Sequence, residues 1–409
     1  MKTLPPAVLF AAVLVDMIGF GIVLPLLPFY AESLGATPLE VTLVVASFSA
    51  MQLVAAPVWG RISDRRGRRP LLVLGLFASA VSYLIFGLAD SLEVLFLSRL
   101  AAGAAGGTIS VAHAYVADTT TAEDRARGMG LIGAAAGLGV MVGPAIGGFF
   151  SRWGLGAPGF VAAGLCALNG LAALFLLPES RPRLGVERRL GEAATLSGWV
   201  RAMVRFPLSL FLSVYFLTIS SFTAMTAVLA LYLERAFGLG AEEMGIVFTL
   251  SGATTVVVRG VVLGRLVRKL GEARTVRVGI AALGLALLLI PLLPSPAWLG
   301  LVVPLYACGA GTLFPSLASL TSQATDAHSQ GSILGGQQVV GGLGRVLGPV
   351  WAGYLFEHLG KASPFQVGAV CVAAAGVLAL RIPALVRAPA VVPGAPDGGV
   401  GSSEPGSSP

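Results

Sequence analysis

The sequence predicts an all-α integral membrane protein with twelve transmembrane helices in two pseudo-symmetric six-helix bundles. Hydrophobic residues make up 56% of the 409 residues and charged residues only 11%, whereas soluble domains carry about 25% charged residues. Apolar runs long enough to cross a bilayer recur twelve times along the chain. Motifs of the first six runs return in the same order in the last six, which favours a duplicated unit.

A membrane-spanning helix needs about 20 mostly apolar residues. The first run begins near Pro5 and is long enough to span, so we expect a retained helix rather than a cleaved signal peptide. We expect the first bundle in residues 1–178, a polar cytoplasmic linker in 179–208, the second bundle in 209–387 and a disordered Pro/Gly/Ser-rich tail in 388–409. The predicted spans lie near 7–29, 40–61, 71–89, 92–117, 128–150, 158–178, 209–233, 242–264, 276–293, 298–322, 332–356 and 364–386.

The basic residues indicate how the chain is oriented in the membrane. Cytoplasmic loops collect Lys and Arg, and here every second loop is basic. The stretch GRISDRRGRRP at 60–70 holds five arginines, and the linker and the 4–5 and 8–9 loops are also rich in arginine. The opposite loops hold little beyond Arg152, Arg235 and Lys361. We therefore expect both termini in the cytoplasm, and the net charge of +7 reflects topology rather than nucleic-acid binding.

Three pairs of motifs relate the two halves. The stretch GRISDRRGRR at Gly60 is echoed by GRLVRKLGEAR at Gly264, and GLGVMVGPAIGG at Gly137 is echoed by GLGRVLGPVWAG at Gly342, each about 205 residues later. The stretch YAESLG near the end of the first span is matched more loosely by YLERAFG near the end of the seventh. Their common order predicts that both halves pack in the same way.

Charged residues inside the first-half spans are candidates for proton coupling. An ionised carboxylate at the position of Asp16 costs about 2.5–3.5 kcal/mol on insertion scales, and desolvation favours its neutral form, so it could take up and release a proton. Arg99 stays charged and needs a partner or water. His113 lies fourteen residues later, about four turns, and titrates near neutral pH. Each residue also has a structural alternative. Asp16 could cap or pair with a neighbouring helix, Arg99 could form a fixed ion pair between helices, and His113 could be a hydrogen-bonded packing residue.

Parallel six-helix repeats with a central cavity are a known transporter architecture. Polar residues in the second half, together with Asp16 and His113, are candidates for lining such a substrate cavity. Arg259 lies deep in the eighth span, where it could attract anionic substrates or face Asp16 across the cavity. Arg345 could likewise face the cavity and attract an anion or pair with a carboxylate. Its alternative is a structural role beside the Gly-Pro pair that follows it in the sequence. We expect one of Gln337 and Gln338 to line the cavity, while the other bonds across a helix interface.

Two glycine-containing stretches have a predicted mechanical role. Gly60 and Gly67 permit close packing and a sharp turn, and Asp64 could pair with Arg65 or Arg68, or accept backbone N–H groups at a helix start. In the fifth span, the four-residue spacing places Gly139, Gly143 and Gly147 on one helix face, where another helix can approach closely, and Pro144 favours a bend.

These motifs resemble those of a known family. Gly60-x-x-x-Asp64-Arg65-x-Gly67-Arg68-Arg69 resembles the signature loop of the major facilitator superfamily, over about residues 5–386. Asp16-Met-Ile-Gly-Phe-Gly-Ile-Val-Leu-Pro-Leu-Leu-Pro28 resembles the first helix of its twelve-helix drug:proton antiporters. Ser98-Arg99-Leu100-x-x-Gly103 and Gly139-x-x-x-Gly143-Pro144-x-x-Gly147-Gly148 resemble their fourth-helix and antiporter motifs. The stretch Ala117-Asp118-Thr119-Thr120 is similar to the corresponding stretch of bacterial tetracycline efflux proteins.

The resemblance implies roles for these positions. It implies that Asp64 reaches the start of the eleventh helix and that Arg65 pairs with Asp118, which would latch the two halves on the cytoplasmic side. It also implies proton transfer by Arg99 and a bias toward export by the antiporter motif. The chain departs from the tetracycline branch where that branch carries two acids and a histidine, at the positions of Ser82, Leu283 and Thr255. The resemblance therefore implies export of drugs or metabolites without implying tetracycline–metal cargo.

We therefore expect a proton-coupled exporter of drugs or small amphiphilic metabolites in the inner membrane of a bacterium. The alternative is a facilitator or exporter of a specific solute, such as a sugar or an organic anion. No nucleophile–base set, metal-ligand spacing or GxxxxGK[ST] loop is present in the sequence, which disfavours an enzyme and ATP drive. We expect no cofactor or metal, a proton gradient as energy source, and a monomer whose partners are substrate, protons and the lipid bilayer. Cys166, Cys308 and Cys371 fit apolar packing.

Overall fold

The computed structural model describes residues 4–180, 203–325 and 330–382, and within these ranges every regular element is a helix. Eleven of the described helices are long and apolar enough to cross a membrane, or twelve if the bent pair α1 (Leu4–Val23) and α2 (Leu27–Ser33) is one span. The predicted all-helical membrane fold is therefore confirmed. The predicted disordered tail at 388–409 and most of the predicted linker lie outside the described residues.

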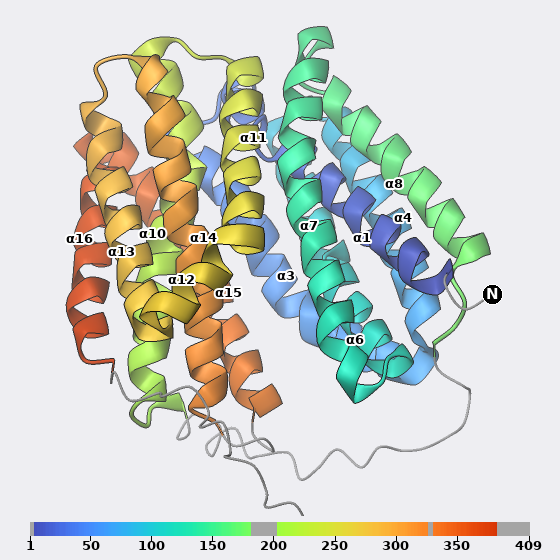
Figure 1. The fold of residues 1–409 in the computed structure, drawn as a ribbon. Helices are drawn as coiled ribbons and strands as arrows, with labels where there is room; N and C mark the ends of the chain where they lie inside the picture. Colours follow the sequence, from blue (N-terminus) through green and yellow to red (C-terminus); the bar gives the residue numbers. More distant parts are fainter. Residues whose placement is uncertain (1–3, 181–202, 326–329, 383–409) are drawn as a thin grey trace, which may run out of the picture.

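The helices of the first half form one group, drawn in blue and green in Figure 1. The capping box between Thr37 and Glu40 starts α3, and the side chains of Ser91 and Thr121 cap the first turns of α5 and α7. Gly67, with φ 97°, makes the sharp turn from α3 to α4. After α1 and α2 the elements are α3 (Pro38–Arg66), α4 (Arg68–Gly87), α5 (Leu92–Ala105), α6 (Thr108–Thr119), α7 (Ala122–Phe150), η1 (Ser151–Trp153) and α8 (Ala157–Leu176).

The helices of the second half form the other group, drawn from light green to red in Figure 1. Gly271, with φ 77°, makes the turn before α13, in the place that Gly67 takes before α4. The elements are α10 (Leu208–Phe237), α11 (Ala241–Val257), the π-helical segment η2 (Val258–Val262), α12 (Leu263–Leu270), α13 (Glu272–Leu289), η3 (Ile290–Leu292), η4 (Pro296–Trp298), α14 (Leu299–Gln323), α15 (Gln330–Leu359) and α16 (Ser363–Leu380).

Three predicted spans are interrupted rather than continuous. The first is bent by 41° between α1 and α2, where Pro25 and Pro28 lie, because proline lacks the N–H that an unbroken helix needs. The fourth breaks at Gly106 and Gly107, between α5 and α6. The eighth contains the π-helical turn of η2, which holds Arg259. Length and hydropathy predict the spans, and the breaks depend on local backbone geometry.

The repeated glycine motif packs in the same way in both halves. A Cβ added at Gly143 of α7 would lie 2.6 Å from the carbonyl oxygen of Ile18 in α1. A Cβ added at Gly348 of α15, its counterpart, would lie 2.4 Å from the carbonyl oxygen of Ser220 in α10. Because these backbones already touch, only glycine fits at either position. The sequence repeat is therefore also a repeat in packing.

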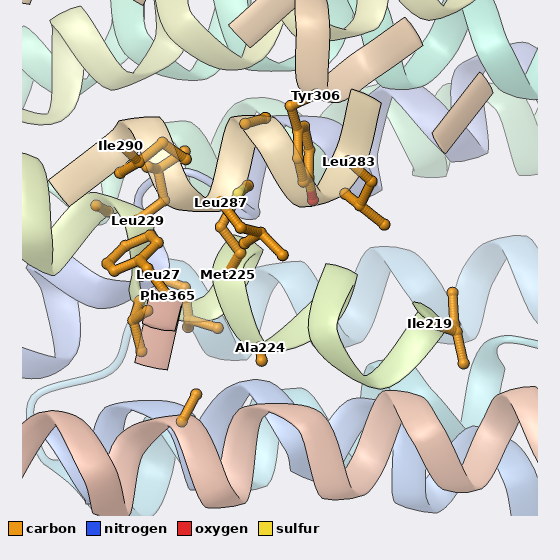
Figure 2. Close-up of a cluster of buried hydrophobic side chains, with 14 of the residues drawn as sticks. Leu27, Ile219, Ala224, Met225, Leu229, Leu283, Leu287, Ile290, Tyr306 and Phe365 are labelled. Carbon is orange, nitrogen blue, oxygen red and sulfur yellow. The ribbon is translucent and has the colours of Figure 1, made fainter. Parts of the chain in front are cut away.

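Buried apolar side chains of both halves form one large cluster, and Figure 2 shows part of it, mostly from the second half but including Leu27 of α2. There the side chains of α10, α13 and α14 interlock, with Leu283 and Leu287 fully buried and Tyr306 nearly so. A second cluster in the first half joins α1, α4, α6 and α7. These clusters make each half a rigid support for the surface that faces the other half.

Candidate functional site

The two halves meet tightly at one end of the molecule, which we call the closed end. There Arg152 of η1 pairs with Glu242 of α11, and Nη2 of Arg235 in α10 donates to Oε1 of Glu32 in α2 at 2.8 Å. The backbone N–H of Leu39 in α3 donates to Oε2 of Glu357 in α15 at 2.9 Å. Three polar links therefore join the halves at this end.

Close backbone packing reinforces the closed end. A Cβ added at Gly148 of α7 would lie 3.1 Å from Cα of Gly245 in α11, and one added at Gly353 of α15 would overlap Thr42 of α3. Gly148 and Gly353 are counterparts in the sequence repeat, and each contacts the opposite half. The contact between the halves is therefore pseudo-symmetric like the halves themselves.

The facing helices α7 and α11 diverge toward the other end, the open end. Along this face, a Cβ added at Gly252 would lie 2.6 Å from Cα of Met141, and one added at Gly137 would first meet Val256 at 3.7 Å. Further along, an added Cβ would meet nothing within 4 Å at either Gly133 of α7 or Gly260 beyond α11. Figure 1 shows these helices side by side at the top of the view. The same empty surroundings occur at other glycines of the open end, namely Gly60, Gly130, Gly264, Gly331 and Gly335.

A pocket of about 490 Å³ lies on the second half toward the open end. Its lining residues come from η2 and α12 and include Arg265 and Arg268. Because α7 and α11 separate in this region, we interpret the space between the halves as a cavity that opens at this end, the end that carries the turns at Gly67 and Gly271.

Asp16 lies in the interior of the first half, on α1. Its side chain is 5% exposed, and the hydroxyl groups nearest its carboxylate are those of Ser79 in α4 and Thr108 in α6. No basic side chain among the described residues forms a salt bridge with it. Asp16 is thus a buried carboxyl group whose nearest polar neighbours are neutral, without a paired cation to offset the cost of burying its charge.

Arg99 lies close by on α5 and is also buried. The guanidinium lies over the rings of Tyr83 and Phe86, 5.8 and 5.2 Å from their centroids, and Nε contacts Oγ of Ser98 at 3.4 Å. Its Nη2 has no hydrogen-bond partner, and no carboxylate of the described chain pairs with Arg99. Cation–π contact with two rings therefore replaces an ion pair.

Tyr83 of α4 connects these two groups. It is 4% exposed, and both Asp16 and Arg99 lie within electrostatic range of its hydroxyl. Gly19, three residues after Asp16, leaves room for its ring, since an added Cβ there would lie 2.9 Å from Cε2 of Tyr83. Sequence reasoning missed Tyr83, because an aromatic residue in an apolar span has the pattern of a packing residue.

His113 is half-buried on α6, and no hydrogen bond or ion pair is recorded for it within the described ranges. The predicted shared face with Arg99 assumed one continuous helix. The break at Gly106 and Gly107 removes the basis of that prediction, because the two residues lie on different helices. Among the described residues, no polar or electrostatic interaction connects His113 with Asp16, Tyr83 or Arg99.

In the second half, the polar candidates gather around Tyr215 of α10. Its hydroxyl contacts the Arg345 guanidinium and lies within electrostatic range of Arg259. Arg259 is exposed although it lies in the middle of a span, and Arg345 is half-buried. The possibility that Arg259 faces Asp16 is not supported, since each has its nearest polar neighbours in its own half.

The two glutamines of α15, Gln337 and Gln338, differ in how far their side chains are exposed. Gln337 is 4% exposed and its Oε1 has no hydrogen-bond partner, whereas Gln338 is exposed. Neither forms a recorded bond across a helix interface within the described part of the chain. Gln337 thus has a buried amide oxygen available for a ligand or water.

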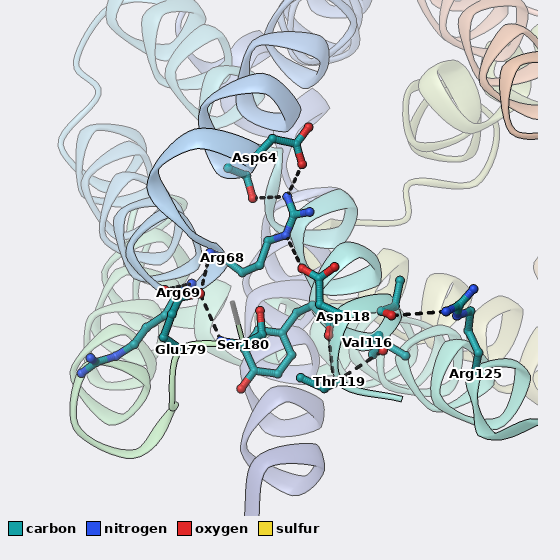
Figure 3. Close-up of polar contacts among 12 residues, drawn as sticks. Asp64, Arg68, Arg69, Val116, Asp118, Thr119, Arg125, Glu179 and Ser180 are labelled. Carbon is teal, nitrogen blue, oxygen red and sulfur yellow. Dashed lines mark hydrogen bonds and ion pairs between the residues drawn. The ribbon is translucent and has the colours of Figure 1, made fainter. Parts of the chain in front are cut away.

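The structure corrects the pairing that the resemblance implied below the fourth helix. Asp118 pairs with Arg68 rather than with Arg65: Nε of Arg68 lies 2.8 Å from Oδ2 of Asp118, and its Nη1 lies 2.8 Å from Oδ1 of Asp64 (Figure 3). The helix α3 ends at Arg66, and the turn at Gly67 points Arg68 inward, while Arg65 stays exposed on α3. The expected contact of Asp64 with the start of the eleventh helix, which is α15 here, stays a prediction.

Further contacts anchor this arginine cluster within the first half. The Arg68 side chain also donates to Oγ of Ser63, and its backbone N–H donates to Oε1 of Glu179 at 2.9 Å (Figure 3). At the open end, no recorded ion pair among the described residues crosses between the halves. The cluster is thus assembled while this end is open.

The antiporter motif contacts both halves. Gly139, Gly143 and Gly147 face α1 of their own half, where a Cβ added at Gly147 would lie 2.2 Å from the Ile22 carbonyl oxygen. The ring of Pro144 also lies against α1, near Gly21, whereas its carbonyl oxygen points to the second half, where it would lie 2.7 Å from a Cβ added at Gly245 of α11. The motif therefore packs against α1 of its own half and also contacts α11 of the second half.

The chain departs from the tetracycline branch at Ser82, Leu283 and Thr255, and none of these three side chains carries a charge. Ser82 and Leu283 are fully buried, and Ser82 donates to the Ser79 carbonyl oxygen. Thr255 donates to the Ser251 carbonyl oxygen within its own helix. These positions contribute no charge to the cavity.

Comparison with known proteins connects this geometry to transport. A family model described as Major Facilitator Superfamily matches residues 9–349. The chain is 32% identical to the tetracycline resistance protein, class E, of Escherichia coli, over 84% of this chain and 86% of that protein. It is 29% identical to the multidrug resistance protein 2 of Bacillus subtilis, over 86% of this chain and 88% of that protein.

Solved structures have the same architecture. The crystal structure of the human organic anion transporter MFSD10 (TETRAN) has a TM-score of 0.69 and 27% identity, over 92% of this chain and 98% of that one. A crystal structure of the nucleoside transporter NupG, in a mutant form, has a TM-score of 0.78 over 92% of this chain and 98% of that one. Its 13% identity limits that likeness to the fold.

Proposed function

Because the chain belongs to the major facilitator superfamily, we propose that it is a proton-coupled exporter of drugs or small amphiphilic metabolites that works by alternating access. Membership makes it a membrane transporter rather than an enzyme, and its relatives include multidrug and tetracycline resistance proteins. Proton coupling, antiport and orientation are the parts that we propose.

The observation that carries the proposal is the buried group of Asp16, Tyr83 and Arg99. A carboxyl and a guanidinium both lie inside the first half without an ion-pair partner among the described residues. Burying unpaired charge in a membrane protein is costly, and such residues mark ion and proton pathways. A carboxyl group that is neutral when protonated and costly when ionised can couple a proton to a conformational change.

We propose that the open end faces the cytoplasm, since the arginine-rich turns lie there. In this state cargo enters from the cytoplasm, and the cavity then closes at the open end as the links of the closed end separate. Outside, a proton on Asp16 favours release of the cargo, and its loss to the cytoplasm completes the cycle. The energy comes from the proton gradient, without a cofactor.

We also propose the cytoplasmic membrane of a bacterium as the location and a monomer as the working unit. Large apolar side chains are exposed along α8, among them Leu168, Phe175 and Leu176, which suits contact with lipid.

The test is proton release when cargo is added to the purified full-length chain in detergent. A panel of cationic, neutral and anionic drugs is added at weak buffering, and the pH is followed with an indicator dye. We expect about one proton released per bound cargo at a pH where Asp16 is protonated in the free protein. The variant Asp16→Asn should bind cargo without release, while Asp90→Asn, at an exposed carboxylate, should behave as the unsubstituted chain.

Binding without proton release by the unsubstituted chain would exclude this coupling. The second candidate function, a facilitator or exporter of a specific solute such as a sugar or an organic anion, would then be preferred. Arg259 and Arg345 favour an anion among such solutes, as does similarity to a structure described as an organic anion transporter. Transport that does not respond to an imposed pH gradient would distinguish it from the exporter.

A further inference from the structure

Two arginines and a tyrosine converge in the second half. The Arg345 guanidinium and the Tyr215 hydroxyl both reach Gly341 of α15, where an added Cβ would lie 3.3 Å from Nη1 of Arg345 and 3.1 Å from Oη of Tyr215. Glycine at this position therefore leaves room for the two polar groups to approach each other between α10 and α15.

Arg259 of the eighth span is the second arginine in this region. It lies in the five-residue π-helical segment η2, within electrostatic range of Tyr215. A π-helical turn changes the direction of the side chains that follow, and such turns occur often at functional sites. An exposed arginine in the middle of a span needs water around it, so we place Arg259 at the cavity rather than against lipid.

The positive charges of this group have no carboxylate partner within the described part of the chain. The acidic side chains of the described second half all lie near helix ends, and they are Glu234 of α10, Glu242 and Glu243 of α11, Glu272 of α13 and Glu357 of α15. Two uncompensated guanidinium groups in a cavity with low-dielectric walls attract an anion strongly.

Aromatic side chains extend from the same group. The ring of Phe314 in α14 lies 5.7 Å from that of Tyr215 and 5.5 Å from that of Phe222, and Phe222 stacks on Tyr306 at 4.9 Å. Phe222 and Phe314 are only half-buried, whereas Tyr306 is buried. The arginines are thus next to an aromatic surface that an apolar ligand can cover.

We infer that Arg259, Arg345 and Tyr215 form a binding site for the acidic group of an amphiphilic organic anion, whose apolar body lies along Phe314 and Phe222. The guanidinium groups bind the carboxylate or sulfonate, and the Tyr215 hydroxyl donates a third hydrogen bond. This inference rests on the proposed transport function, since it names the class of cargo that the cavity selects.

The test compares three ligands that share a phenylpropyl body and differ in the charge and chemistry of the head group: 4-phenylbutyrate, its neutral amide 4-phenylbutyramide and the cation 4-phenylbutylamine. Dissociation constants are measured by titration calorimetry with the full-length chain in detergent. Since hydrogen bonds between charged groups are the stronger kind, we expect the anion to bind about ten-fold tighter than the amide, and the cation most weakly.

Variants assign the preference to the site. Arg345→Gln and Arg259→Gln should each weaken binding of the anion about ten-fold, while leaving binding of the amide unchanged. The matched control Arg381→Gln removes an exposed charge at the end of α16 and should leave both constants unchanged. If one of the two cavity variants fails to fold, judged by size-exclusion chromatography, the other decides.

Equal affinity for the three ligands, or equal losses in the cavity and control variants, would overturn the inference. The proposed function fails separately: if cations are bound with proton release and the anion is not preferred, the exporter stands and the anion site does not. If the anion is preferred and no proton is released, the site stands and proton coupling does not.

Discussion

At the residue scale, Arg68 shows how one position in an arginine run acquires a distinct role. Its guanidinium bridges Asp64 and Asp118 and its side chain is 9% exposed, whereas Arg65 lies exposed three residues earlier. The sequence locates the basic stretch but does not say which arginine turns inward, because that depends on where α3 ends and on the turn at Gly67.

Replacing Arg68 should therefore destabilise the protein more than replacing Arg65. Arg68→Ala leaves two carboxylates without their shared cation, and we expect a loss of about 2 kcal/mol in the free energy of unfolding. Arg65→Ala should change it by less than about 0.5 kcal/mol, as for surface positions in general. The measurement is denaturant unfolding of the two purified variants in detergent, and similar midpoints for both would contradict the pairing.

Single charged residues in apolar spans were located from the sequence, since charge is rare there. Asp16 and Arg99 are buried in the interior of the first half, and their role in proton coupling stays a prediction. Tyr83 and Tyr215, which contact these charges or the arginines of the second half, were missed. A tyrosine among apolar residues has the same pattern whether it packs or binds, and only its neighbours in space distinguish the two.

At the element scale, α7 carries two kinds of glycine surface. Gly147 faces α1 of the same half in direct backbone contact, while Gly133 faces the open end with nothing within 4 Å of an added Cβ. The four-residue spacing in the sequence predicts close packing for the first surface. The second surface has no partner in this conformation, so its use depends on a movement of the whole half.

Larger side chains should separate these two roles. Gly133→Leu should fold and bind cargo, but we expect transport to fall at least about ten-fold, because a leucine there obstructs closure of the open end against the second half. Transport is measured in proteoliposomes with an imposed pH gradient. The control is Gly164→Leu, because an added Cβ at Gly164, on the exposed surface of α8, also meets nothing within 4 Å. This variant should transport normally.

Unchanged transport by Gly133→Leu would mean that the two halves do not approach each other at this position. A variant in the surface of α7 that packs against α1 should instead fail at folding rather than at transport. Gly147→Leu should fail to accumulate as folded protein, since an added Cβ would lie 2.2 Å from a backbone oxygen that cannot move aside.

At the scale of the whole molecule, three polar links and two glycine contacts hold the closed end together, while the open end has no recorded ion pair between the described parts of the two halves. Composition and repeats predict the twelve spans and the two related halves. They do not predict which end is closed, because that depends on a small difference between weak contacts at the two ends.

Weakening the closed end should shift the protein toward the opposite conformation. The double variant Glu32→Gln/Glu242→Gln removes the two ion pairs that join the described parts of the halves, and we expect the population closed at the open end to rise about two- to five-fold. Distances between spin labels on the ends of α7 and α12, in a chain whose three native cysteines are replaced, report the two populations.

The matched control for that measurement is Glu93→Gln, an exposed glutamate near the start of α5 at the same end. It should leave the distance distribution unchanged. If the double variant does the same, the glycine contacts rather than the ion pairs maintain the closed end.

The exposure of the closed-end links makes the molecule sensitive to dissolved salt on one side of the bilayer. Arg152 and Glu242 are 54% and 41% exposed, and ions screen such exposed charges over about 8 Å at physiological ionic strength. The Arg68 cluster at the other end is better shielded, with the guanidinium 9% exposed. A high salt concentration on the side of the closed end should therefore weaken the links between the halves, whereas the same concentration on the side of the open end should affect the Arg68 cluster less.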